Sequence, residues 1–153
     1  WATLALRAAQ TIRRYDNRHR IVYAVKGTTT TPIASITPLP GIANQAIEVH
    51  FYNWTNVQMN GVAYPSTGRT KDDLARVLHG LAVREAEMGV PVYVGEVAIV
   101  RTHPNAPRFL RDFTSLCDQE GLDLTVHAFR EADVWNYELN PSAWSILTTW
   151  LAQ

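Results

Sequence analysis

One carboxylate stands at the end of an apolar stretch of this sequence. Residues 90–97 read Val-Pro-Val-Tyr-Val-Gly-Glu-Val, a run long enough for a strand buried on both faces of a parallel sheet. The run closes on Glu96, which follows Gly95. In an α/β barrel, a polar residue at the C-terminal end of a strand is where chemistry is expected. Glu96 is therefore a candidate catalytic carboxylate, and a solvated glutamate at a strand end is the alternative.

A second stretch, residues 46–52, places three polar side chains on one face of a strand. The alternation puts Glu48, His50 and Tyr52 on one side and only apolar side chains on the other. Three polar groups on one face of an otherwise apolar strand indicate a wet or catalytic lumen. A hydrogen-bonded core pair is the alternative for His50 and Tyr52.

The elements that would carry these residues alternate along the chain. The sequence predicts strands over residues 20–25, 46–52, 92–97 and 122–129, and helices over residues 1–15, 70–89, 108–120 and from 141 onwards. Such alternation indicates a parallel sheet. The long loops all follow strands, as on the functional face of a barrel, but a full (β/α)₈ barrel takes about 250 residues. This chain holds only four strands and begins in the middle of a unit.

Composition narrows the classes of protein and partner. The chain has 153 residues, of which 46% are hydrophobic, and a formal net charge of zero. This length suits one domain with a real core, and the charge balance disfavours a nucleic-acid partner. The single cysteine, Cys117, excludes an internal disulfide and is expected to be a packed thiol.

No stretch has the length of a membrane span and no signal peptide is evident. Because the chain opens on Trp1 rather than Met, we expect it to be part of a longer gene product.

Three motifs follow one another in an informative order. They are Glu-Val-His-Phe-Tyr at 48–52, Pro-Val-Tyr-Val-Gly-Glu at 91–96 and His-Ala-Phe-Arg-Glu at 127–131, with Thr-Pro-Leu-Pro at 37–40 before them. Together they resemble the C-terminal half of glycoside hydrolase family 5, the cellulase-type retaining β-glycanases, over nearly the whole chain. The resemblance implies an α/β fold that is half of a (β/α)₈ TIM barrel. Four parallel strands with flanking helices would then form a single half-barrel domain over residues 1–153.

The resemblance also implies roles for residues at the strand ends. Glu96 occupies the position of the family's nucleophile in the hydrolysis of β-glycosidic bonds, and His50 and Tyr52 would lie beside it. Hydrogen bonds from an imidazole and a phenol can keep a carboxylate ionised and aimed at the anomeric carbon. The alternative is a half-barrel without catalysis, which binds sugar or only folds and self-associates.

Substrate-binding residues are expected on the loops after the strands. Trp54 and Trp135 could stack on sugar rings, or they could pack the loops down, and Arg130 could bind hydroxyl groups. His127 stands where many members of the family place an aromatic residue, which puts that sugar platform in doubt. The implied ligand is a β-linked oligo- or polysaccharide, with no cofactor and no membrane partner. By the same resemblance we expect a secreted or extracellular protein.

One part of the family's chemistry is absent. The general acid/base of the family is a glutamate in an Asn-Glu-Pro motif, and no Asn-Glu-Pro occurs in this sequence. Retaining hydrolysis requires two carboxyl groups about 5–5.5 Å apart. We therefore expect the chain to pair with a missing N-terminal half-barrel or to form a homodimer in which the outer strands meet. In such a dimer the partner's copy of Glu131 is a tentative substitute for the acid/base.

A metal site is a third hypothesis. His50, His103 and His127 could in principle supply imidazole ligands. Their positions do not follow the spacing of a known metal motif, so we expect no metal.

Overall fold

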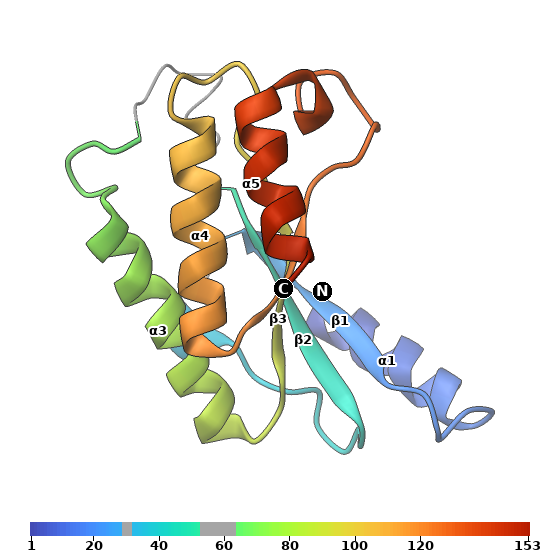
Figure 1. Ribbon diagram of the computed structural model, residues 1–153. Coiled ribbons are helices and arrows are strands. Elements are labelled where there is room, and N and C mark those ends of the chain that lie inside the picture. Colours follow the sequence, from blue (N-terminus) through green and yellow to red (C-terminus); the bar gives the residue numbers. More distant parts are fainter. Residues whose placement is uncertain (29–31, 53–63) are drawn as a thin grey trace.

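The protein forms one sheet of four parallel strands with helices packed against it (Figure 1). The computed structural model describes residues 1–28, 32–52 and 64–153. The strands are β1 (Ile21–Thr28), β2 (Gln45–Phe51), β3 (Val92–Val97) and β4 (Asp123–Val126), in the spatial order β1-β2-β3-β4. Each strand pairs with the next one along the chain, all in parallel. This arrangement confirms the expected half of a (β/α)₈ barrel.

The helices fall into two groups. The helices α3 (Lys71–Met88), α4 (Ala106–Glu120) and α5 (Pro141–Leu151) lie side by side over one face of the sheet, whereas α1 (Ala2–Arg13) lies beside β1 (Figure 1). Two 3₁₀ turns, η1 (Ile33–Ser35) and η2 (Tyr137–Leu139), sit in connecting segments. The opposite face of β2, β3 and β4 carries the polar side chains, and it corresponds to the lumen of a barrel.

Local sequence signals explain where α3 begins and ends. Thr70 Oγ1 accepts a hydrogen bond from the backbone N–H of Asp73, and the Asp73 carboxylate accepts the N–H of Thr70. This reciprocal pair satisfies two N–H groups that a helix start leaves unpaired. At the other end Gly89 adopts a φ of 61°, a left-handed conformation that favours glycine.

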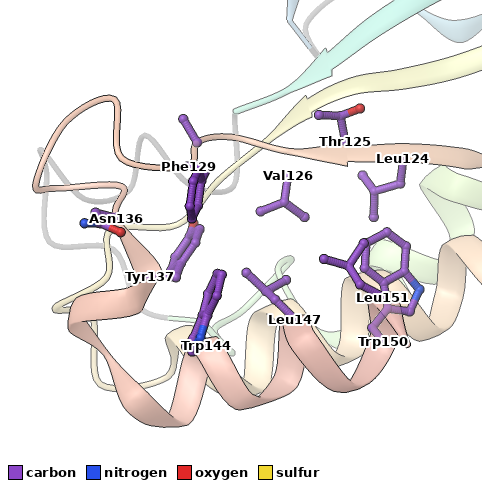
Figure 2. A pocket seen from close by; sticks show the side chains of 11 residues that line it. Leu124, Thr125, Val126, Phe129, Asn136, Tyr137, Trp144, Leu147, Trp150 and Leu151 are labelled. Carbon is purple, nitrogen blue, oxygen red and sulfur yellow. The ribbon is translucent and has the colours of Figure 1, made fainter. Parts of the chain in front are cut away.

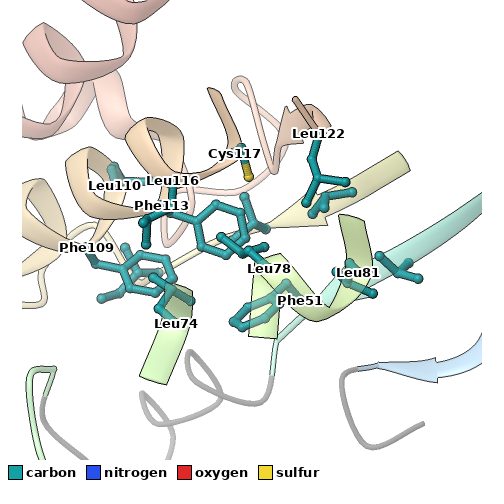
Figure 3. Close-up of a cluster of buried hydrophobic side chains, with 14 of the residues drawn as sticks. Phe51, Leu74, Leu78, Leu81, Phe109, Leu110, Phe113, Leu116, Cys117 and Leu122 are labelled. Carbon is teal, nitrogen blue, oxygen red and sulfur yellow. The ribbon is translucent and has the colours of Figure 1, made fainter. Parts of the chain in front are cut away.

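The hydrophobic core lies between the sheet and its three covering helices (Figure 3). Phe51 of β2 is fully buried, with its ring centroid 5.0 Å from that of Phe113 on α4. Cys117 is also fully buried there, and loss of hydration raises the pKa of its thiol to about 12. The thiol is therefore a packing group, as predicted.

Some boundaries differ from the sequence prediction. β1 continues to Thr28, beyond the predicted end at residue 25. β4 ends at Val126, three residues before the predicted end. The 3₁₀ turns η1 and η2 were not predicted, since both lie in segments rich in turn-forming residues and lack helical periodicity.

The aromatic contact between sheet and helix gives a stability prediction. We expect Phe113→Ala to lower the free energy of unfolding by about 3–5 kcal/mol, because it removes a ring from a closely packed core. Urea denaturation measures this change. Tyr15→Ala is the control, since the Tyr15 side chain is 88% exposed. Equal effects of the two substitutions would contradict this account of the core.

Candidate active site

A shift in strand pairing brings Glu96 to the polar face. In β2 and β3, Val49 lies opposite Val94, so regular pairing would place His50 opposite Gly95. The register shifts at this point, and His50 lies opposite Glu96 instead. The Glu96 carboxylate near the end of β3 therefore lies on the same face as the polar side chains of β2. Val94, two residues earlier on the same strand, is buried beneath the helices on the other face.

Two side chains of the β2 segment approach one oxygen of this carboxylate. The Tyr52 hydroxyl donates a hydrogen bond of 2.6 Å to Glu96 Oε2, and His50 Nδ1 lies 3.3 Å from the same oxygen. Phe51, between them in sequence, points into the core on the other face. The structure therefore brings together the three residues predicted as catalytic, on the predicted side of the sheet.

The surroundings hold Tyr52 in its neutral, donating form. Partial burial removes hydration that a phenolate would need, and the adjacent Glu96 carboxylate both accepts the phenol hydrogen and repels a second negative charge. These effects raise the pKa of Tyr52 far above its ordinary value of 10.0. Tyr52 can therefore act as a hydrogen-bond donor over the whole neutral range, but it is a poor general acid or base there.

His50 also contacts a second carboxylate on its other side. Glu48 Oε1 lies 3.1 Å from His50 Nε2, and the side chains of both residues are about a quarter exposed, at 24% and 29%. Sequence analysis placed Glu48 on the polar face but gave it no role. The alternation of Glu48 with His50 and Tyr52 along the strand could have indicated that Glu48 contacts His50.

An aromatic corner lies next to the carboxylate. We use this name for Tyr52, His127 and Trp135, whose ring centroids are separated by 6.0 to 6.5 Å. His127 follows the end of β4, and its Nε2 lies 3.4 Å from Glu131 Oε2. The structure thus places two of the predicted sugar-binding residues together and beside Tyr52.

The other predicted binding residues do not join this corner. Arg130 donates two hydrogen bonds, of 2.5 and 2.9 Å, to the carboxylate of Glu138, and its guanidinium lies 4.8 Å from the ring centroid of Phe129. Nε and Nη2 of Arg130 are therefore engaged within its own loop. Trp54 lies outside the described residues.

Hydrogen bonds hold together the loops that follow β3 and β4. The buried Tyr137 hydroxyl accepts the backbone N–H of Ile99 at 2.8 Å and donates to the carbonyl oxygen of Ile99 at 2.7 Å. The backbone N–H of Arg101 donates to the carbonyl oxygen of Val134. These bonds fix the segment that carries Trp135 relative to the end of β3.

Neither a metal centre nor a membrane segment is found among the described residues. Within the described ranges, no three His, Cys, Asp or Glu side chains are grouped so that they could hold a metal ion. His50, His103 and His127 accordingly do not form such a group. In the same part of the chain, no helix is both long and apolar enough to cross a membrane.

Comparison with known proteins shows the fold. No protein-family model and no curated protein sequence matches the chain. Solved structures do match. A hyperthermophilic endo-β-1,4-glucanase in complex with substrate aligns with a TM-score of 0.72 at 14% identity, over 95% of this chain and 54% of its own.

Two further solved structures are similar to this chain over about half of their own length. A family 5 xyloglucan-specific endo-β-1,4-glucanase from a metagenomic library, in complex with cellotriose, aligns over 92% of this chain and 47% of its own, with a TM-score of 0.68 and 14% identity. Thermotoga maritima Cel5A in complex with mannotriose aligns over 94% and 54%, with a TM-score of 0.69 and 17% identity. The chain thus spans about half the length of these structures and has the fold of half a glycoside hydrolase barrel.

The environment of Tyr52 predicts its behaviour at high pH. Tyrosinate absorbance at about pH 11 should be the same in folded Tyr52→Phe and in the unsubstituted protein, because the Tyr52 phenol stays neutral there. In urea the substitution should remove one tyrosine's absorbance, which is the internal control. If Tyr52→Phe lowers the absorbance of the folded protein too, the Tyr52–Glu96 contact is wrong.

The contribution of this contact to stability is present below about pH 10 and declines as pH rises, since the unfolded chain loses the proton first.

Proposed function

We propose that the chain is the C-terminal half of a retaining β-glycoside hydrolase in which Glu96 is the nucleophile. The observation that carries this proposal is a strand-end carboxylate whose Oε2 receives a hydrogen bond from Tyr52 and faces a ring nitrogen of His50. This is the environment that a carboxylate nucleophile needs, because hydrogen bonds stabilise its charge and fix its direction. The likeness to half of several endoglucanase barrels supports the same proposal.

The contacts of Glu96 suggest which oxygen attacks. Among the described residues, the contacts from Tyr52 and His50 both reach Oε2, so Oε1 is the oxygen directed at the anomeric carbon. Attack forms a glycosyl ester with Glu96 while the bond to the leaving oxygen breaks. A second carboxylic acid must protonate that oxygen, and a water molecule then hydrolyses the ester.

The aromatic corner supports a sugar ligand beside the nucleophile. Trp135 offers an indole face, and His127 offers a ring that can also donate or accept a hydrogen bond. We propose a β-linked glucan, mannan or related chain as the ligand class. The cellotriose and mannotriose complexes of the similar structures support this class. A contribution of Trp54 remains part of the proposal.

The second carboxyl group is proposed to come from outside this half-barrel. No Asn-Glu-Pro motif is present, and Glu131 of the same chain contacts His127. A second copy could bring its own Glu131 toward Glu96, and an N-terminal half-barrel could supply a glutamate at the end of its last strand. Without either, the chain would be a sugar-binding or merely self-associating half-barrel.

An activated substrate analogue tests the nucleophile without the missing acid. A 2-deoxy-2-fluoro-β-cellobioside with a dinitrophenolate leaving group needs no proton on departure, so attack by Glu96 alone can form the glycosyl ester. We expect mass spectrometry to find one added fluorinated cellobiosyl group, on the peptide that contains Glu96.

Glu96→Gln and Glu131→Gln are the matched controls for this labelling. Glu96→Gln should abolish it, whereas Glu131→Gln should not, because Glu131 is not the attacking group. No label on the unsubstituted chain after prolonged exposure, or an unchanged label on Glu96→Gln, would refute the assignment of the nucleophile.

The partner half should cover the apolar groove between β4 and α5. This groove, of about 360 Å³, is lined by apolar and aromatic side chains, including Phe129, Trp144, Trp150 and Leu151 (Figure 2). It adjoins β4, whose outer edge pairs with no other strand among the described residues. Unpaired strand edges and large apolar patches favour association. A second copy, with β1 of one chain beside β4 of the other, would cover the groove and both outer strands.

Sedimentation at micromolar concentration tests this association. We expect a dimer for the unsubstituted chain and a shift toward monomer for Leu151→Glu, because Leu151 is 71% exposed at the groove. Val83→Glu on α3 is the matched control, since Val83 is also exposed and does not line the groove. A stable, compact monomer at all concentrations would exclude a second copy as the partner half.

A further inference from the structure

The carboxylate of Glu48 extends the contacts of the site by one residue. His50 bridges two carboxylates, with Nε2 3.1 Å from Glu48 Oε1 and Nδ1 3.3 Å from Glu96 Oε2. Glu48 and Glu96 lie on different strands, so this imidazole links β2 to the end of β3. The Glu48–His50–Glu96 chain is thus a continuous polar connection behind the proposed nucleophile.

Gly95 makes room for Glu48 at this position. A Cβ atom added to Gly95 would lie 1.9 Å from Glu48 Oε1 and 2.5 Å from both Cγ and Cδ of the same side chain. The Glu48 side chain therefore lies across the backbone of β3, in space that any larger residue would fill. Because Gly95, directly before the proposed nucleophile, has no side chain, the Glu48 carboxylate can lie next to His50.

Hydrogen-bond chemistry shows which atom donates in the contact between His50 and Glu48. A carboxylate can only accept hydrogen bonds, so the ring nitrogen that is hydrogen-bonded to the Glu48 carboxylate is the donor and carries the hydrogen. That nitrogen is Nε2, which lies 3.1 Å from Glu48 Oε1. The bond fixes the orientation of the ring, and Nδ1 then lies on the side of Glu96.

We propose that Glu48 is a positioning residue, which holds His50 so that its Nδ1 stays beside Oε2 of Glu96. The inference rests on the proposed role of Glu96 as nucleophile. Glu48 accepts the Nε2–H and thereby fixes the orientation of the ring. Nδ1 then stays 3.3 Å from the oxygen to which Tyr52 donates, and Oε1 keeps its direction toward the anomeric carbon.

Ionisable groups near this unit come from several segments. They include Tyr52 just after β2, Tyr93 opposite Glu48 on β3, and His127 with Glu131 after β4. Tyr137 of η2 also acts electrostatically on Tyr52. Nε2 of His127 also lies near a glutamate, 3.4 Å from Glu131 Oε2, but His127 follows a different strand and faces Tyr52 at a ring distance of 6.1 Å. It is therefore a suitable internal reference for a measurement on His50.

Nitrogen-15 NMR of the histidine rings tests the inference without any activity. In the unsubstituted chain, we expect Nε2 of His50 to have the shift of a nitrogen that carries a hydrogen, because the Glu48 carboxylate accepts from it. In Glu48→Gln an amide replaces this carboxylate, so the Nε2 signal should move. Gly95→Ala should also change the Nε2 signal, because it displaces the Glu48 carboxylate. The His127 signals should stay unchanged in both variants.

Labelling rates show whether this positioning matters for the nucleophile. With the activated fluoro-cellobioside, Glu48→Ala should slow labelling of Glu96 by about tenfold or more, because a loosely held His50 misdirects the carboxylate. The concentration for half-maximal labelling should change little. Glu48→Gln should restore part of the lost rate, since its amide still fixes the ring.

The two measurements separate the failure of this inference from that of the proposed function. An Nε2 of His50 without a hydrogen in the unsubstituted chain, or an Nε2 signal that Glu48→Gln leaves unchanged, would overturn the role of Glu48. Equal labelling rates in the unsubstituted chain and in Glu48→Ala would overturn it as well. If the NMR changes occur but Glu96 is never labelled, the Glu48–His50 contact stands and the nucleophile assignment fails.

Discussion

The pairing shift between β2 and β3 determines most of the chemistry in this structure. Parallel strands keep their side chains in register, so a strand that buries Val92 and Val94 under helices should also turn Glu96 toward them. A charged group buried there without a partner would be costly. The shift between Val49 and His50 moves Glu96 to the opposite face, where a phenol and an imidazole meet it. The shift therefore keeps the Glu96 charge out of the core and also brings it into contact with Tyr52 and His50.

The site combines a floor from the sheet with a wall from the segment after β4. The floor consists of side chains from β2 and β3, whose orientation follows from the sheet and from the core beneath Phe51. The wall is the segment after β4, which is held to the end of β3 by the Tyr137 hydroxyl and by backbone hydrogen bonds. This division matches a general feature of α/β barrels, in which the strands position the reacting groups and the loops select the ligand.

The sequence could predict those parts of the structure that depend on local periodicity. Alternation in β2 was enough to place Glu48, His50 and Tyr52 on one face, and the capping residues of α3 were enough to place that helix. The position of Glu96 could not be obtained in this way, because regular alternation in β3 predicts the wrong face. Only the resemblance to glycoside hydrolases indicated it. The partner of Arg130 was also beyond local patterns, since it depends on a loop conformation. Alternation placed Glu48 on the same face as His50, but it gave no sign of the space above Gly95 that the Glu48 side chain occupies.

The strand order β1-β2-β3-β4 has a consequence for how the chain acquires this structure. Every strand pairs with the strand before it in sequence, so no strand has to wait for a distant segment to arrive. Each new helix and strand can add to a sheet edge that already exists, and the loop-closure entropy of each addition is limited to one unit. A ribosome that releases the chain from its N-terminus would therefore deliver the units in the order in which they can dock. The Glu96 contacts would form only once the third strand has joined the second.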